Sequence, residues 1–358
     1  MTNSLSDYLK IVTPHLDPQL ATPQAIAQLQ ALARRLPIAS AALLECRLSD
    51  ENPDIDLHAS FTHVPSNLTD RFLPNPAWQA CQTLCQEWMD STSPLHQLIN
   101  NLILEFDLPA HSPDAQSIEA ISPSPYIMFK SAMTIDRQAL IKRTLELLQK
   151  LPDPALIAQI QHCLHVLPEE ASLANIGVWL ARPHQAVRLT IKEIQFEQVP
   201  AYLEQIGWPH PTHPLTAYTS TLAPFVDTLA LAIDLDPTLH PKIGLECFAT
   251  KEFHNQECWQ ALIDHLVKTS LCSPAKRNAL LTWTGFTQRV DRPQLWPANL
   301  TYGDLLMGSN AVSFFWRKIN HIKLIYQPGQ PLTAKAYLAF GHCWMNRDNV
   351  VFTPDHAA

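Results

Sequence analysis

Short runs of alternating apolar and polar residues recur along most of the chain, and they come in pairs. The run AALLECRL sets Glu45 and Arg47 against apolar neighbours. After the turn SDENPD, the run IDLHASF sets Asp56, His58 and Ser60 against apolar neighbours. A period of two predicts a half-buried β-strand, and a short turn between two such runs predicts an antiparallel hairpin. The first pair is therefore expected to be a hairpin with one apolar and one polar face.

The same order of two strands followed by helices repeats down the chain. Further strands are expected at about 101–107, 126–130, 175–180, 187–192, 230–233, 241–248, 322–326 and 335–340. Helices are expected at about 23–36, 76–90, 136–150, 154–166, 197–206, 215–231 and 259–267, and from 274 onward. A proline directly follows the capping residues Thr22 and Ser273, as is typical of helix N-termini. The stretch 284–311 has no clean period and is expected to be loop with some helix.

This pattern predicts an α+β fold of about five strand-strand-helix units. We expect a single domain over residues 1–358, with an N-terminal segment at 1–19 and a C-terminal tail at 346–358. Nearly every strand has one polar face, and two architectures explain it. Open antiparallel sheets with helices on one face would leave the polar face in water. A ten-stranded barrel with helices outside would turn that face toward a polar lumen, which the residue types on it favour.

Composition narrows the class of protein. Apolar residues make up 46% of the 358 residues and charged residues 16%, so the chain can bury a large core. The net charge of −8 argues against a general role in binding nucleic acid or anionic membranes. With eight glycines, the chain contains neither G-x-G-x-x-G nor G-x-x-x-x-G-K-[ST], so a glycine-rich phosphate loop is not expected.

The cysteines and the N-terminal residues indicate the cellular compartment in which the protein is expected. The N-terminal residues lack the basic and apolar regions of a signal peptide, and no apolar run is long enough to span a membrane. The eight cysteines are dispersed, most of them in apolar patterns such as those around Cys46 and Cys247. Dispersed thiols of this kind are typical of a reducing compartment. We therefore expect a cytoplasmic protein with reduced cysteines.

Cations and aromatic rings recur on the polar strand faces. Cations from different strands can bind a diphosphate without a phosphate loop, through charge-assisted hydrogen bonds. Aromatic rings between them can shield a carbocation by cation–π contact. The candidate substrate-binding residues are Arg47, Lys130, Trp179, Arg188, Lys192, Lys242, Lys323, Tyr326, Lys335 and Tyr337.

Three carboxylates on the same faces are candidates for a catalytic base. They are Glu45, Glu105 and Glu246, and each is set against apolar neighbours in its strand. A positioned carboxylate can accept the proton that an acceptor loses when it is alkylated. Glu246 lies four residues after Lys242 on one strand face, so a structural ion pair is the alternative interpretation for it.

The fivefold alternation of antiparallel strand pairs with helices resembles the ABBA, or PT-barrel, prenyltransferases. The resemblance covers about residues 20–345, and its local echoes are Lys335-x-Tyr337 and the strand with Arg188 and Lys192. It implies a barrel whose lumen holds an isoprenoid diphosphate and an aromatic small-molecule or peptide acceptor. It also implies that the K-x-Y strand binds the diphosphate and screens the cation. The resemblance fixes no cofactor, and leaves open whether Mg²⁺ accompanies the diphosphate.

Two other functions stay open. Cys343, next to His342 on a repeated strand-strand-helix scaffold, resembles the nucleophile of pentein hydrolases and amidinotransferases, in which a Cys, a His and acidic residues act on guanidines. A non-catalytic peptide-binding or scaffold protein is the alternative from another class. Metal binding is not expected, because Cys81-x-x-x-Cys85 and the run from His162 to His165 lack the paired spacing of a zinc site.

Overall fold

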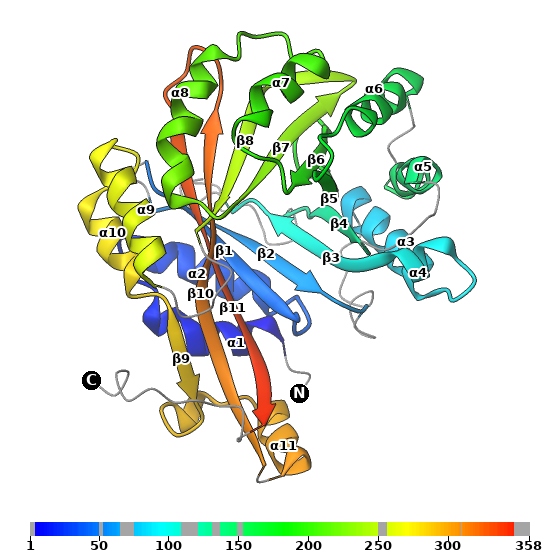
Figure 1. Cartoon of the computed structure of the whole chain (residues 1–358). Coiled ribbons are helices and arrows are strands. Elements are labelled where there is room, and N and C mark those ends of the chain that lie inside the picture. Colours follow the sequence, from blue (N-terminus) through cyan, green and yellow to red (C-terminus); the bar gives the residue numbers. More distant parts are fainter. Residues whose placement is uncertain are drawn as a thin grey trace.

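The computed structural model describes residues 4–49, 53–64, 75–108, 121–130, 137–148, 153–249, 256–308 and 310–346. An eleven-stranded sheet lies at its centre, with neighbours in the order β11-β1-β2-β3-β4-β5-β6-β7-β8-β10-β9. β11 also pairs with β10, so ten antiparallel strands close into a barrel and β9 adds to β10 outside the ring (Figure 1). The strands are β1 (Ala41–Arg47), β2 (Ile55–Phe61), β3 (Ile99–Phe106), β4 (Ser124–Phe129), β5 (Ser172–Val178), β6 (Val187–Lys192), β7 (Thr228–Asp236), β8 (Thr238–Phe248), β9 (Gly285–Gln288), β10 (Ala311–Tyr326) and β11 (Thr333–Asn346).

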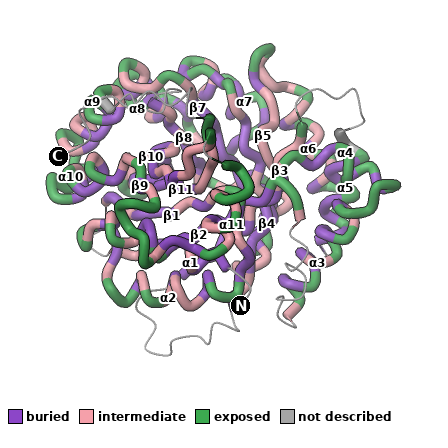
Figure 2. The backbone as a smooth tube through the Cα atoms, turned by 90° about the horizontal axis from the view of Figure 1, so that it is seen from below, coloured by how far each residue is buried: buried purple, intermediate pink, exposed green. Residues whose placement is uncertain are grey.

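Helices surround this barrel, as the view in Figure 2 shows. The α-helices are α1 (Leu5–Val12), α2 (Pro23–Ala33), α3 (Pro76–Met89), α4 (Pro94–Leu98), α5 (Arg137–Leu147), α6 (Pro154–His165), α7 (Gln198–Gln205), α8 (His213–Leu222), α9 (Gln256–Lys268), α10 (Pro274–Leu281) and α11 (Ala298–Met307). Short 3-10 helices lie at η1 (Thr13–His15), η4 (Ala223–Phe225) and η5 (Pro293–Leu295).

The high proline content has a local cause at the helix starts. Thr22, Asn75, Asp153 and Ser273 each precede a proline, and each side chain accepts a hydrogen bond from a backbone N–H of the first helical turn. Such a cap satisfies a donor that the helix leaves free, and proline fits the first turn because it has no N–H to satisfy. The same pairing at Ser93 begins α4. This capping rule places five helices directly after a short polar residue and a proline.

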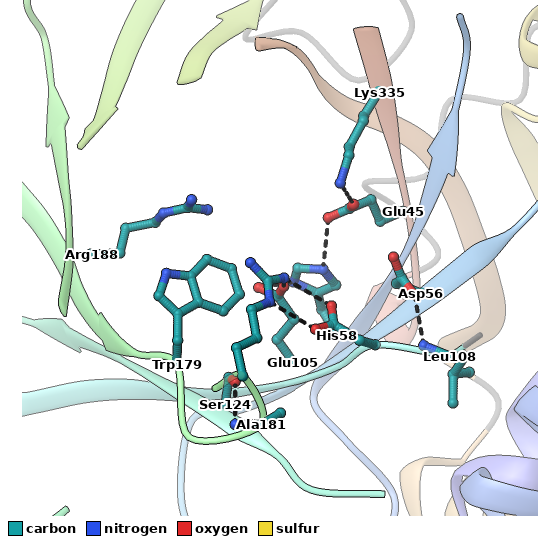
Figure 3. A network of polar contacts seen from close by, with 12 residues as sticks. Glu45, Asp56, His58, Glu105, Leu108, Ser124, Trp179, Ala181, Arg188 and Lys335 are labelled. Carbon is teal, nitrogen blue, oxygen red and sulfur yellow. Dashed lines mark hydrogen bonds and ion pairs between the residues drawn. The ribbon is translucent and has the colours of Figure 1, made fainter. Parts of the chain in front are cut away.

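The two faces of the strands lie in different surroundings. Leu44, Leu57 and Leu104, from neighbouring strands, are fully buried in the hydrophobic core, and α2 contacts β2 from outside. The alternate residues Glu45, His58 and Glu105 are also buried, but inside the ring (Figure 3). The barrel prediction is therefore confirmed over the open-sheet alternative, because both edges of the sheet meet at β10 and β11.

The structure differs from the sequence prediction in three elements. The helix expected to reach residue 231 ends at Leu222, because Pro224 cannot continue it, and β7 begins at Thr228. β10 begins at Ala311 instead of about 322, because a register shift between Ile319 and His321 breaks the alternation that would have revealed it. β9 lies within the stretch expected to be loop and helix.

All eight cysteines are free of disulfide bonds, and six of them are buried, as expected. No helix in the described part of the chain is long and apolar enough to cross a membrane. The expected C-terminal tail lies outside the described residues from 347 onward.

Candidate functional site

A cavity of about 930 Å³ opens at the end of the barrel where hairpin turns join the strands within each pair. Its wall carries the cations Arg47, Arg182, Lys242 and Lys335 and the carboxylates Asp56 and Asp107. The strand alternation explains this set, because Arg47 and Lys335 are register partners on β1 and β11 and share the inner face. Four cations from four strands or turns thus meet at one opening, which we call the mouth of the barrel.

Lys242 differs from the other cations at the mouth because it forms no ion pair with a carboxylate of the described residues. It makes no hydrogen bond or ion pair that the described residues reveal, and it lines the cavity from the start of β8. Burial lowers the pKa of Lys242 to about 8, and the positive charges of Lys335 and Arg188 add to the effect. Arg182 lowers the pKa of Lys242 further and Asp234 opposes these cations, so the charges around Lys242 are on balance positive. The mouth is therefore suited to an anion.

Below the mouth, Glu45 accepts hydrogen bonds from two neighbours on β11. Lys335 Nζ forms an ion pair with Glu45 Oε1, and the Tyr337 hydroxyl donates to Glu45 Oε2 at 2.6 Å. Burial alone would raise the pKa of Glu45, but Lys335 and His58 hold it well below its usual value. Glu45 is therefore a fixed anion within the lumen.

His58 lies between two carboxylates (Figure 3). Its Nε2 is 3.4 Å from Glu45 Oε2, and its Nδ1 is 3.8 Å from Glu105 Oε2. Burial would lower the pKa of His58, but Glu105 and Glu45 raise it above its usual value. The two carboxylates therefore favour the protonated form of the imidazole that lies between them.

The same three residues are close enough to one another to hold a metal ion. However, Glu45 and Glu105 face opposite nitrogens of the His58 ring, so no single ring nitrogen is shared by both. Glu45 is also occupied by Lys335 and Tyr337. A metal would have to displace these contacts, so the geometry fits an ionic network better than a metal centre.

Trp179 stands just after β5, between two guanidinium groups. The Arg182 guanidinium carbon lies 3.3 Å from the Trp179 ring centroid, and that of Arg188 lies 4.4 Å from it. Arg182 donates two hydrogen bonds to Asp107, at 2.8 and 2.9 Å, and one to Glu105 at 3.3 Å. The Tyr126 ring meets Trp179 edge-on, with centroids 5.6 Å apart. Trp179 therefore lies at the boundary between the mouth and the deeper lumen.

Deeper in the lumen the charges are paired. Arg188 donates to both carboxylate oxygens of Asp234, at 2.6 and 2.8 Å, and Lys323 donates to Glu246 at 2.9 Å. Burial would raise the pKa values of Asp234 and Glu246, but these cations lower both to about 2. Gly244 allows this arrangement, because a Cβ atom there would lie 2.3 Å from Lys323 Cε.

The structure divides the predicted diphosphate cluster. Lys242 and Lys335 line the cavity, whereas Arg188 and Lys323 are paired below it. Lys192 lies at the end of β6 away from the mouth, half-exposed and 3.9 Å from Glu193.

Three further candidates occupy different places. Arg47 lies at the mouth, 3.4 Å from both Asp54 and Asp56. Lys130 is exposed just beyond the end of β4. Tyr326 faces the helices, against Trp208 and Tyr218, so its assignment to the lumen is wrong. The reason is the pleat: Tyr326 is an odd number of residues from Lys323, and alternate residues point to opposite faces.

Sequence reasoning missed Arg182, Asp107 and Asp234 as site residues. Arg182 lies in the turn between β5 and β6, where no alternation indicates a face. Asp107 and Asp234 lie near or within strands on the same side as the predicted cations. For Asp107 the available signal was the alternation, because it lies two residues after Glu105, whereas the pairing of Arg188 with Asp234 depends on the register of β6 against β7.

The residues of the other hypotheses lie elsewhere. Cys343 is on β11 toward the end away from the mouth, paired with Phe314, and burial raises the pKa of its thiol. His342 Nε2 is 2.7 Å from the Ser313 hydroxyl. Cys343 is absent from the described wall of the cavity, so the arrangement expected of a pentein nucleophile is not met. His162 contacts the Gln205 carbonyl.

The sequence matches no protein-family model and no curated protein. Solved structures do match. The apo prenyltransferase PriB aligns over 93% of this chain and 94% of its own, with a TM-score of 0.51 and 11% identity. The ternary complex of PriB with L-tryptophan and dimethylallyl thiolodiphosphate aligns over 93% and 96%, with a TM-score of 0.51 and 12% identity.

A third structure, 5-dimethylallyltryptophan synthase from Streptomyces coelicolor, aligns over 93% and 95% with a TM-score of 0.45 and 12% identity. At such identities a structural match establishes the fold and leaves activity to the site itself. The closed ring of ten antiparallel strands with helices outside agrees with the two PriB matches. This chain therefore has the barrel fold of the ABBA, or PT-barrel, prenyltransferases.

Proposed function

We propose that this protein is a transferase of the prenyltransferase type, which takes an isoprenoid diphosphate and an aromatic acceptor, free or within a peptide. The observation that carries the proposal is the mouth of the barrel, where Lys242 lies among cations that line one cavity and has no ion pair with a carboxylate of the described residues. A diphosphate would supply the missing negative charge through charge-assisted hydrogen bonds. The fold supports the same class, since the matching PriB complex holds L-tryptophan and a dimethylallyl diphosphate analogue.

The proposed reaction is a substitution at the allylic carbon. The bond from that carbon to the diphosphate oxygen breaks, and the diphosphate leaves with the electron pair into the field of Lys242, Lys335 and Arg47. The acceptor forms a bond to the allylic carbon and loses a proton to a carboxylate. Cations placed at the departing group stabilise the charge that develops on it.

Among the three predicted bases, Glu105 has the geometry that suits this role best. Glu246 is held by Lys323, which lowers its pKa to about 2 despite burial. Glu45 is held by Lys335 and Tyr337, and its pKa is well below the usual value. A carboxylate with so low a pKa is a poor proton acceptor. Glu105 is bonded by Arg182 at 3.3 Å and lies beside the His58 imidazole.

The carboxylates of the cavity do not fit a magnesium site of their own. Asp107 is held by two hydrogen bonds from Arg182. Asp56 accepts the Leu108 N–H, and burial together with Glu45 raises its pKa to about 7. Mg²⁺ prefers free, ionised oxygen ligands in octahedral geometry. We therefore propose that the cations of the mouth neutralise the diphosphate and that binding needs no metal.

Calorimetric titration with dimethylallyl diphosphate tests the proposal, with and without a chelator. The Lys242→Ala variant should bind about ten-fold more weakly than the wild type, because a charge-assisted hydrogen bond is worth roughly 1.5–3 kcal/mol. Lys268→Ala removes an exposed lysine from α9 and should bind as the wild type does. Chelation should change the affinity less than about two-fold. Equal binding by Lys242→Ala and the wild type, or no saturable binding, would overturn the assignment.

A non-catalytic binding protein on the same fold is the second candidate. It is favoured by one observation: Arg188, Lys323 and Lys335 each already have a carboxylate partner inside the barrel. Release of free diphosphate separates the two candidates. Turnover with L-tryptophan or an aromatic peptide as acceptor supports the transferase, whereas saturable binding without turnover across such acceptors supports the binding protein. A cytoplasmic location is proposed with either, on the basis of the eight free cysteines.

A further inference from the structure

Arg182 stacks on the Trp179 ring and also lines the cavity. Both Ala181 and Arg182 line the cavity, and the guanidinium carbon lies 3.3 Å from the indole centroid. This separation is the stacking distance of two flat groups in contact. An aromatic ring could take the same place without any shift of Trp179. Movement of the Arg182 side chain would therefore extend the cavity onto the Trp179 ring and toward Glu105.

Two buried polar atoms without partners among the described residues lie on the neighbouring strands β4 and β5. Tyr126 is more than nine-tenths buried, yet its hydroxyl has no hydrogen-bond partner among the described residues. Its ring packs directly on Gly177, where a Cβ atom would lie 2.3 Å from the tyrosine ring, so glycine is needed for this close approach. The side-chain Oδ1 of Asn175, two residues before Gly177 on the same strand face, is also buried without a partner in the described part of the chain. A buried polar atom left unpaired destabilises a structure unless a ligand or water completes it.

Glu105 lies beside Trp179 and Tyr126 and is held only weakly by Arg182. Arg182 bonds it through a single contact at 3.3 Å, while its two shorter bonds go to Asp107 at the rim. Asp107 is well exposed, with 38% of its side-chain surface accessible. Arg182 can therefore swing outward and keep Asp107 as its partner while it leaves Glu105 and Trp179.

We propose that the face of Trp179 beneath Arg182 is an inner subsite for a planar aromatic ligand that carries an N–H or O–H group, and that Arg182 fills this subsite when the ligand is absent. The ring of the ligand stacks on Trp179 in place of the guanidinium. Its N–H or O–H donates to Glu105, and Tyr126 pairs with a second polar atom. The inference rests on the proposed function, because the ligand would be the aromatic acceptor. It adds that Trp179 and Glu105 select this acceptor and that the Arg182 side chain competes with it.

Calorimetric titration of the full-length protein with indole, in the absence of any diphosphate, tests the subsite. Arg182→Ala should bind indole roughly ten-fold more tightly than the wild type, because the ligand no longer displaces a stacked and hydrogen-bonded side chain. The same variant should bind 1-methylindole roughly ten-fold more weakly than indole, because the donor to Glu105 is gone. Trp179→Leu should abolish indole binding. Trp208→Leu removes a buried tryptophan on the helix side of the barrel and is the matched control.

Thermal unfolding of each variant shows whether it remains folded, and a folded Trp179→Leu keeps the test valid if Arg182→Ala does not fold. Indole affinity in Trp179→Leu equal to that of the wild type would overturn the subsite. So would a folded Arg182→Ala variant that binds indole no more tightly than the wild type. Titration with dimethylallyl diphosphate separates this result from the proposed function, since Trp179→Leu should keep diphosphate affinity within about two-fold. Indole binding as expected, with no diphosphate binding by the wild type, would support the subsite and overturn the transferase.

Discussion

The mouth of the barrel and the deeper lumen use the same residue types in different ways. Both regions take their cations from the inner faces of neighbouring strands. In the deeper lumen, Arg188 and Lys323 each lie within hydrogen-bond distance of a carboxylate. At the mouth, Arg47, Arg182 and Lys335 also have carboxylate partners, but Lys242 lies among these cations and has no ion pair among the described residues.

The difference separates charges that hold the barrel from charges that can hold a ligand. A paired charge inside a protein regains through its partner part of the free energy that it loses by leaving water, and it offers little to a ligand. An unpaired cation beside other cations has a lowered pKa and a strong tendency to attract an anion. The number of cations in a lumen therefore says less about ligand binding than the number of carboxylates opposite them.

The largest effect is expected from breaking an inner pair. Glu246→Ala leaves Lys323, whose side chain is only 6% exposed, without its carboxylate. Removal of one partner of a buried pair typically costs about 3–5 kcal/mol of stability. Denaturant unfolding of Glu246→Ala should show a loss of this size. The double variant Glu246→Leu with Lys323→Met should recover most of the lost stability, because no unpaired charge remains. A loss below about 1 kcal/mol in Glu246→Ala would contradict the conclusion that the charges of the deeper lumen stabilise the barrel.

A smaller effect is expected from pH at the mouth. The pKa of Asp56 is raised to about 7 by burial and by Glu45, so Asp56 gains a negative charge as pH rises through 7. The pKa of Lys242 is lowered to about 8, so Lys242 loses its positive charge as pH rises through 8. Both changes act in the same direction, and diphosphate affinity should fall roughly ten-fold or more between about pH 7 and 9.5. The last ionisation of a phosphate ester has a pKa near 6 and is about nine-tenths complete at pH 7, so the ligand contributes little above that pH.

Lys242→Arg is the control for this pH dependence. A guanidinium stays charged throughout the range, so the fall in affinity near pH 8 should disappear while the smaller fall near pH 7 remains. Titrations of wild type and variant at several pH values give the comparison. Parallel curves for the two proteins would mean that Lys242 does not contact the anion.

The sequence predicted the barrel because its strands have a strict period of two. Nine of the ten expected strands follow from alternation and the one at 230–233 from a short apolar run, and β10 was shortened where the shift at His321 interrupts the period. Candidates such as Glu45 and Lys335 were found because their strands assign them to one face, and the structure places them in contact. Tyr326 was misassigned against that same rule.

Pairing between side chains could not be predicted in the same way. Arg188 and Asp234 are 46 residues apart, and their contact depends on the register of β6 against β7. Register is set by packing of the whole sheet rather than by either strand alone. Arg182 was missed because it lies in a turn, where a side chain has no period to give its direction.

The smallest effect is expected at the far end of the barrel, at Lys192. This lysine was predicted to bind the diphosphate with Lys335, but it lies beyond the deeper lumen, with 39% of its side chain exposed and Glu193 at 3.9 Å. An exposed pair at this distance contributes little, so Lys192→Ala should change the free energy of unfolding by less than about 0.5 kcal/mol. Its affinity for dimethylallyl diphosphate should equal that of the wild type within about two-fold, because salt screens charges separated by more than about 10 Å. A ten-fold loss of affinity in Lys192→Ala, measured beside Lys242→Ala, would instead place the diphosphate deep in the lumen. It would then follow that the inner ion pairs open when the ligand binds, and that the mouth is an entrance rather than the site.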